Sequence, residues 1–131
     1  MTDEDTLRAA NASWNEGGFD SFASYLAPDV VWHAPPEYPE GDTWYGREAL
    51  VSAWHAQFDS VFDSYTTVIT ELEPGPDMWF SAQTTNGHAK GSGMHLDWTD
   101  YMVCRIQDDL IKELWVYHDR DEARRKAGLE P

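Results

Sequence analysis

The sequence is poor in cysteine, in basic residues and in long apolar runs. Cys104 is the only cysteine among 131 residues, so the chain can form no internal disulfide and no thiolate cluster that binds a metal. Nine Lys and Arg stand against 24 Asp and Glu, and the formal net charge of −15 repels phosphates and anionic lipids. No apolar stretch approaches the ~20 residues that cross a bilayer, and the acidic N-terminus lacks the features of a signal peptide. We therefore expect a cytoplasmic protein that binds neither nucleic acid nor a membrane.

Aromatic residues, in contrast, are abundant. The chain has 7 Trp, 6 Tyr and 5 Phe, and 41% of its residues are hydrophobic. These side chains are sufficient for a core, which excludes disorder as a description of the whole chain. The length allows one domain, and we predict that it spans residues 1–131.

The expected elements are helices first and strands afterwards. Apolar residues at helical spacing predict three helices, at 3–15, 19–26 and 46–62, with a break at Gly17-Gly18 and an end before Pro28. Residues 34–43 contain three prolines and predict a rigid exposed loop. Strands are predicted at 29–34, 65–72, 78–85, 95–106 and 110–119, and a short helix at 120–127. This order predicts an α+β fold in which helices cover one face of a strongly curved antiparallel sheet.

Asp100 interrupts the pattern of the strand predicted at 95–106. Alternation along a strand places it on a face whose other members are apolar: Leu96, Trp98, Met102, Cys104 and Ile106. A carboxylate in such a row must be hydrogen-bonded, neutral or open to a cavity. Two interpretations stay open, because Asp100 can cap a neighbouring loop or face a pocket.

The last predicted strand does not show which of its faces is buried. One face carries Ile111, Glu113, Trp115, Tyr117 and Asp119, and the other carries Lys112, Leu114, Val116 and His118. If the sheet curls around a cavity, the first set lines it with aromatic and carboxylate side chains, as an acid/base site for a small apolar molecule requires. Otherwise the two carboxylates of that set lie at exposed strand ends.

The motifs of metal, phosphate and nucleophile chemistry are missing. The five histidines match no zinc motif, and the sequence contains neither a phosphate-binding glycine loop nor a nucleophile motif. We therefore expect neither a metal nor a cofactor. His33, at the end of the first strand, is a candidate general base, with a structural loop histidine as the alternative.

Three segments resemble the SnoaL-like branch of the NTF2-like superfamily in their order and spacing. They are Leu26-Ala-Pro-Asp-Val-Val-Trp-His, Tyr45-Gly-Arg-Glu-Ala-Leu and Glu113-Leu-Trp-Val-Tyr-His-Asp-Arg. The resemblance covers nearly the whole chain. It implies a cone in which a curved antiparallel sheet and N-terminal helices enclose a deep pocket, and a homodimer formed through the sheet.

The same resemblance bears on the site residues. In the polyketide cyclases an acid/base Asp follows the last-strand Trp by four residues, and Asp119 follows Trp115 at that distance. The base and the first-helix Tyr of the ketosteroid isomerases correspond to Ala34 and Ala10, which implies that their chemistry is absent. The limonene epoxide hydrolases need an Arg and an Asp in the third strand, and residues 78–85 have neither. An epoxide hydrolase is therefore disfavoured.

We predict a cofactor-free enzyme that isomerises, cyclises or dehydrates a small apolar carbonyl or polyketide-like compound. The candidate catalytic residues are Asp119, Asp100 and His33. The candidate ligand-binding residues are Trp32, Trp54, Phe58, Trp98, Met102, Trp115 and Tyr117. The alternative is a pocket that binds a small molecule without catalysis, or a dimerisation module, in which the tryptophans are core residues.

Overall fold

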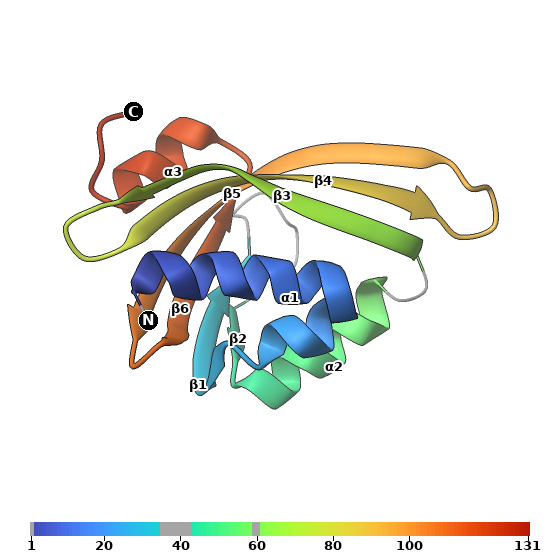
Figure 1. Cartoon of the computed structure of the whole chain (residues 1–131), viewed down its shortest axis with the longest axis horizontal. Coiled ribbons are helices and arrows are strands. Elements are labelled where there is room, and N and C mark those ends of the chain that lie inside the picture. Colours follow the sequence, from blue (N-terminus) through green and yellow to red (C-terminus); the bar gives the residue numbers. More distant parts are fainter. Residues whose placement is uncertain (1, 35–42, 59–60) are drawn as a thin grey trace.

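Six strands form one bent sheet with helices on both faces (Figure 1). A computed structural model describes residues 2–34, 43–58 and 61–131, and for residues 57 and 58 it describes the backbone alone. The strand order is β2-β1-β6-β5-β4-β3. The bounds are β1 Leu26–His33, β2 Thr43–Tyr45, β3 Phe62–Pro74, β4 Trp79–Ala89, β5 His95–Gln107 and β6 Leu110–Tyr117. Neighbouring strands are antiparallel except β1 and β6, which are parallel.

Helices α1 (Asp3–Ala23) and α2 (Arg47–Phe58) lie on the same side of the sheet, which we call the inner face (Figure 1). Helix α1 begins with a capping box, in which the Thr2 hydroxyl accepts from the Asp5 amide and the Asp5 carboxylate accepts from the Thr2 amide. Gly18 interrupts the helix with φ 75° and ψ −161°, a conformation that only glycine adopts without strain. The two helices predicted around this position are therefore the two halves of one kinked helix.

Helix α3 (Arg120–Lys126) lies on the opposite, outer face of the sheet (Figure 1). Beneath it Phe80 and Val103 are fully buried together with Ala123 of the helix itself. Two arginines tie the helix to β3: Arg120 contacts both carboxylate oxygens of Glu71, and Arg124 contacts Glu73 at 2.7 Å. The larger core cluster lies on the inner face, between the sheet and α1 and α2, and includes Leu7, Phe22, Leu26, Leu50, Ile111 and Leu114.

The structure differs from the predicted elements at residues 24–28 and at strand β2. Residues 24–28 do not continue a helix, since α1 ends at Ala23 and Pro28 lies inside β1. The β1–β6 register is irregular between Leu26 and Val31, so the missing proline N–H interrupts no regular ladder. The short strand β2 falls where no strand was predicted, although its three residues, Thr-Trp-Tyr, are all favoured in strands. Residues 35–42 of the predicted proline-rich loop lie outside the described residues.

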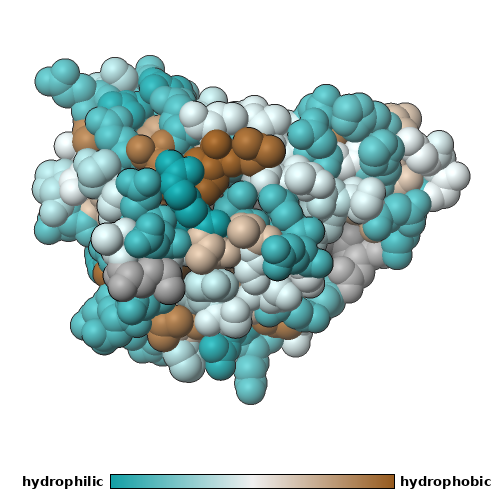
Figure 2. Space-filling model, in the orientation of Figure 1, coloured by the Kyte–Doolittle hydropathy of each residue, from teal (hydrophilic) through white to brown (hydrophobic). Residues whose placement is uncertain are grey.

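Hydrophilic side chains dominate the surface seen in Figure 2, and hydrophobic ones form only small patches there. In the described part of the chain, no helix has both the length and the apolar character needed to cross a bilayer.

Candidate functional site

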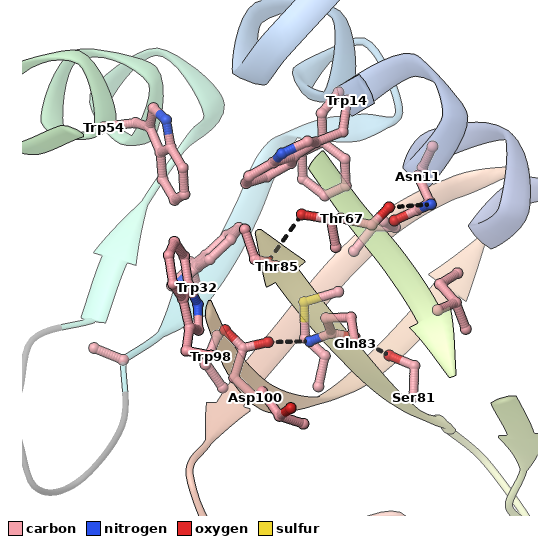
Figure 3. A pocket seen from close by; sticks show the side chains of 18 of the residues that line it. Asn11, Trp14, Trp32, Trp54, Thr67, Ser81, Gln83, Thr85, Trp98 and Asp100 are labelled. Carbon is pink, nitrogen blue, oxygen red and sulfur yellow. Dashed lines mark hydrogen bonds between the residues drawn. The ribbon is translucent and has the colours of Figure 1, made fainter. Parts of the chain in front are cut away.

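A cavity of about 520 Å³ lies between the inner face of the sheet and helices α1 and α2 (Figure 3). This volume falls within the ~300–1,000 Å³ typical of sites for small organic ligands. Its walls come from helices α1 and α2 and from all six strands, with β2 contributing Trp44. The lining is mostly apolar, and its polar groups gather on β4 and β5.

Five of the seven tryptophans line the cavity: Trp14, Trp32, Trp44, Trp54 and Trp98. Each of them is only partly buried, so part of its surface remains uncovered by the protein. Trp54 stacks on Phe19 at 4.5 Å between ring centroids and meets the Trp14 ring nearly at right angles at 4.9 Å. These aromatic contacts fix the ring positions, and the cavity is left open between them.

Strand β4 contributes a polar row to this apolar cavity. Ser81, Gln83 and Thr85 face inward, while Phe80 and Ala82 face the outer core. The Ser81 hydroxyl donates to Gln83 Oε1 at 3.0 Å, and Thr85 shares a 2.9 Å hydrogen bond with Thr67 of β3. The sequence analysis did not identify this row. Its signal is the alternation of polar residues along a strand whose other face is apolar.

Asp100 is the carboxyl group at the end of this hydrogen-bonded chain. Gln83 Nε2 donates to Asp100 Oδ1 at 2.6 Å, and Figure 3 shows Asp100, Gln83 and Ser81 at the opposite end of the pocket from Trp14 and Trp54. Burial raises the pKa of Asp100 above its ordinary value, while the hydrogen bond from Gln83 and the nearby charge of His118 oppose that rise. The structure thus supports the second interpretation of Asp100, in which it faces a pocket.

His118, immediately after β6, also lines the cavity and interacts electrostatically with Asp100. Sequence reasoning favoured the other face of this strand. Arg105 pairs with Glu113 but the next residue, Ile106, pairs with Ile111, so Lys112 is an extra residue in β6. Such a bulge reverses which side chains point inward, and it brings both Ile111 and Val116 to the cavity.

The bulge places Trp115 and Tyr117 on the outer face, and neither lines the cavity, although both were predicted to bind the ligand. Trp115 contacts Lys126, whose Nζ lies 4.3 Å from the ring centroid, and Tyr117 packs in the cluster beneath α3. Trp32, Trp54, Trp98 and Met102 do line the cavity, in agreement with the sequence analysis. The side chain of Phe58, also predicted to bind the ligand, lies outside the described residues.

His33 lies on the outer face as well, although Trp32 beside it points into the cavity. Its Nε2 is 2.7 Å from Glu113 Oε2, and its ring stacks on Trp115 at 4.9 Å. Glu113 also accepts from Arg105 at 2.7 Å. The structure therefore does not bring His33 together with Asp100.

Asp119 is exposed and caps α3, where its Oδ1 accepts from the amide of Glu122 at 3.1 Å. It is not among the residues that line the cavity. Asp119 follows Trp115 by four residues, as in the polyketide cyclases, but it does not line the cavity that contains Asp100.

Among the side chains that the structure describes, no group of three or more His, Cys, Asp or Glu is arranged to hold a metal ion. The described side chains that line the cavity supply two carboxyl groups, an imidazole, two amides and hydroxyls, set among indole rings.

The fold, with a pocket between the curved sheet and helices α1 and α2, defines a class: an α+β cone. A model of the SnoaL-like domain matches residues 7–114, and the chain belongs to this family. No curated protein matches the sequence significantly.

Solved structures of the same fold cover almost the whole chain. IdmH from Streptomyces antibioticus, a polyketide cyclase candidate, has a TM-score of 0.75 at 20% identity over 98% of this chain and 100% of its own. An NTF2-like protein of unknown function from Burkholderia pseudomallei has a TM-score of 0.74 at 19% identity, covering 95% of this chain and 97% of its own. A protein with a ketosteroid isomerase-like fold from Catenulispora acidiphila, in complex with trimethylamine, has a TM-score of 0.72 at 21% identity, covering 98% and 95%. At these identities the similarity establishes the fold.

Proposed function

We propose that the protein is a cofactor-free acid/base enzyme in which Asp100 moves a proton on a small apolar carbonyl or polyketide-like compound. The observation that carries this proposal is the position of Asp100, whose carboxyl group lines an apolar cavity and accepts a hydrogen bond from a buried amide. A carboxyl group whose pKa is raised by burial is a stronger base when ionised and a usable acid when protonated. The family and the similarity to IdmH support a polyketide-like substrate.

The reaction begins with the ionised carboxylate of Asp100. It takes a proton from the carbon next to the substrate carbonyl, and the electron pair of the broken C–H bond forms an enolate. The indole N–H of Trp98 and the side chain of His118 lie beside the carboxylate, where they are available to stabilise the enolate oxygen. Protonated Asp100 then returns the proton to another atom of the substrate. Isomerisation, cyclisation and dehydration all share this first step.

We propose in addition that two copies of the chain associate through the outer face of the sheet. Helix α3 covers this face only in part, and Val68 of β3 is 52% exposed there. Sedimentation velocity of the wild-type protein and of Val68→Asp tests this. We expect a dimer that the charged side chain dissociates, and a monomeric wild-type protein would contradict the proposal.

The test of catalysis is solvent deuterium exchange at the carbon next to the carbonyl, measured by NMR on a panel of apolar ketones and lactones. Loss of one general base typically costs 10²–10⁴-fold, so Asp100→Asn should lower the exchange rate by about 100-fold or more. Ligand binding, followed by tryptophan fluorescence, should persist in this variant. The exposed Asp63→Asn is the matched control and should exchange at the wild-type rate.

Two outcomes would contradict the assignment. If Asp119→Asn abolishes exchange and Asp100→Asn does not, the proton is moved by Asp119, as the resemblance to the polyketide cyclases implies. If the wild-type protein binds members of the panel but exchanges no proton, the cavity binds small molecules without this chemistry.

A further inference from the structure

The charges around the cavity are distributed unevenly. None of the nine Lys and Arg residues of the chain lines it, and all nine lie in the described part of the sequence. The carboxyl groups of Asp100 and Asp97 do line it, and His118 is the other titratable residue among the described ones that line it. Asp97 is exposed and its Oδ1 is 2.9 Å from Nε2 of His95, so the inner carboxyl group is that of Asp100.

Lysines and arginines of the chain contact aromatic rings on the outer face of the sheet and not in the cavity. On the outer face, Lys126 and Arg105 lie over the ring of Trp115, and Arg120 and Arg124 lie over that of Phe80. The five tryptophans of the cavity have no Lys or Arg beside them in the cavity wall. Because an indole face attracts a cation, these partly uncovered rings offer an interaction that the lysines and arginines of the chain do not use.

We propose that the cavity binds an organic cation, an ammonium group with apolar substituents, which contacts the tryptophan rings and faces Asp100. This inference goes beyond the proposed function, because such a ligand binds in the same cavity without any transfer of a proton.

Three physical terms favour a cation over a neutral molecule of the same shape. The carboxylate of Asp100 provides the opposite charge in a partly dehydrated site, where the attraction between charges is stronger than in water. The indole rings replace part of the hydration of an alkylammonium group, which is itself weakly hydrated. The net charge of −15 concentrates cations near the protein and speeds their association. An anion of the same shape finds neither a lysine nor an arginine in the cavity wall.

Three small molecules of nearly the same shape test the proposal: choline, the neutral 3,3-dimethylbutan-1-ol and the anionic 3,3-dimethylbutanoate. Their dissociation constants are measured by titration calorimetry and by quenching of tryptophan fluorescence. We expect choline to bind at least about tenfold tighter than the alcohol, and the anion to bind weakest of the three. In Asp100→Asn the ratio between choline and the alcohol should fall below about threefold. In the control Asp63→Asn, which removes an equal charge from an exposed position of β3, the ratio should stay at the wild-type value.

The pH dependence provides a second measurement that needs no variant. Choline keeps its charge at every pH, so a change in its affinity reports on the protein. Its affinity should fall as the pH is lowered, because Asp100 loses its charge. The other titratable groups at the cavity among the described residues are His118 and Asp97, and Asp97 is paired with His95. The proposal is overturned if the alcohol binds as tightly as choline, if Asp100→Asn keeps the wild-type preference, or if choline does not bind. None of these outcomes depends on proton exchange, so the proposed function is tested separately.

Discussion

Gln83 provides the sharpest test of how the site is built. The residue is only 8% exposed, and its side-chain amide bridges two groups, accepting from Ser81 at 3.0 Å and donating to Asp100 at 2.6 Å. The substitution Gln83→Met keeps the length of the side chain and removes both hydrogen bonds. The bond to Asp100 depends on pH, because its acceptor is a carboxylate at high pH and a neutral carboxyl group at low pH.

The expected loss of stability differs between the ionised and the neutral form of Asp100. A hydrogen bond to a charged group contributes about 1.5–3 kcal/mol and one between neutral groups about 0.5–1.5 kcal/mol. The loss of the Ser81 bond and the new packing of methionine are common to both states and cancel in the comparison. Gln83→Met should therefore destabilise the protein by about 1–1.5 kcal/mol more at pH ~8 than at pH ~3. The larger loss of stability at high pH agrees with the effect of Gln83 on the pKa of Asp100. The hydrogen bond from Gln83 lowers this pKa, so its removal should raise it.

Urea unfolding followed by tryptophan fluorescence measures this difference. The wild-type protein, Gln83→Met and the control Gln107→Met, at the exposed end of β5, are compared at both pH values. The control should change the free energy of unfolding by less than about 0.5 kcal/mol at either pH. If Gln83→Met costs the same at both pH values, or more at low pH, Gln83 does not donate to an ionised Asp100 and the account of the site is incorrect.

Three further predictions concern the rest of the fold. Burial raises the pKa of the Cys104 thiol to about 12, so the native protein should not react with a thiol-specific disulfide reagent until urea unfolds it. Fast reaction of the native protein would contradict the burial of Cys104. Gly128→Ala should destabilise the protein by about 1–2 kcal/mol in thermal unfolding, since φ is 82° and a Cβ would lie 2.9 Å from Pro76 Cδ. Arg120→Gln should lower the free energy of unfolding only slightly, as urea unfolding measures it, because its contact with Glu71 is partly exposed. That cost should decrease with salt and as the pH falls, since Arg120 lowers the pKa of Glu71 and the contact is lost on protonation of the carboxylate.

The sequence was sufficient for the fold class and for one half of the site. Helical and alternating periodicities predicted most elements, because their spacing follows from the geometry of helices and strands. Asp100 could be found because a carboxyl group in an apolar row is an exception that needs a physical reason. Trp32, Trp54, Trp98 and Met102 were also found, since β1, α2 and β5 follow the expected pattern where they contact the cavity.

The residues of β6 that face the cavity could not be predicted, because one extra residue in this strand determines which side chains point inward. The extra residue at Lys112 reverses the faces of β6, and nothing in Leu110-Ile-Lys-Glu-Leu-Trp distinguishes a bulged strand from a regular one. The strand therefore presents His118 to the cavity and Trp115 to α3. The polar row at Ser81 and Gln83 was missed for a different reason, since its role depends on Asp100 of the neighbouring strand, 17 residues away in the sequence.

The two proposals for the cavity share Asp100, and this shared group leads to a further prediction. Base catalysis requires the carboxylate form, and so does the preference for a cation. Proton exchange and choline affinity should therefore both increase with pH over one range, above the ordinary range of an aspartate because burial raises the pKa of Asp100.

Both measurements are made on the wild-type protein and on Asp100→Asn, in which the part of the pH dependence that comes from Asp100 should disappear from both. His118 is another titratable group that acts on Asp100. The variant His118→Gln separates the two contributions, because it should leave a single transition that belongs to Asp100. If the two measurements then have midpoints more than about one pH unit apart, the group that moves the proton and the group that attracts the cation are different, and at least one role assigned to Asp100 is incorrect.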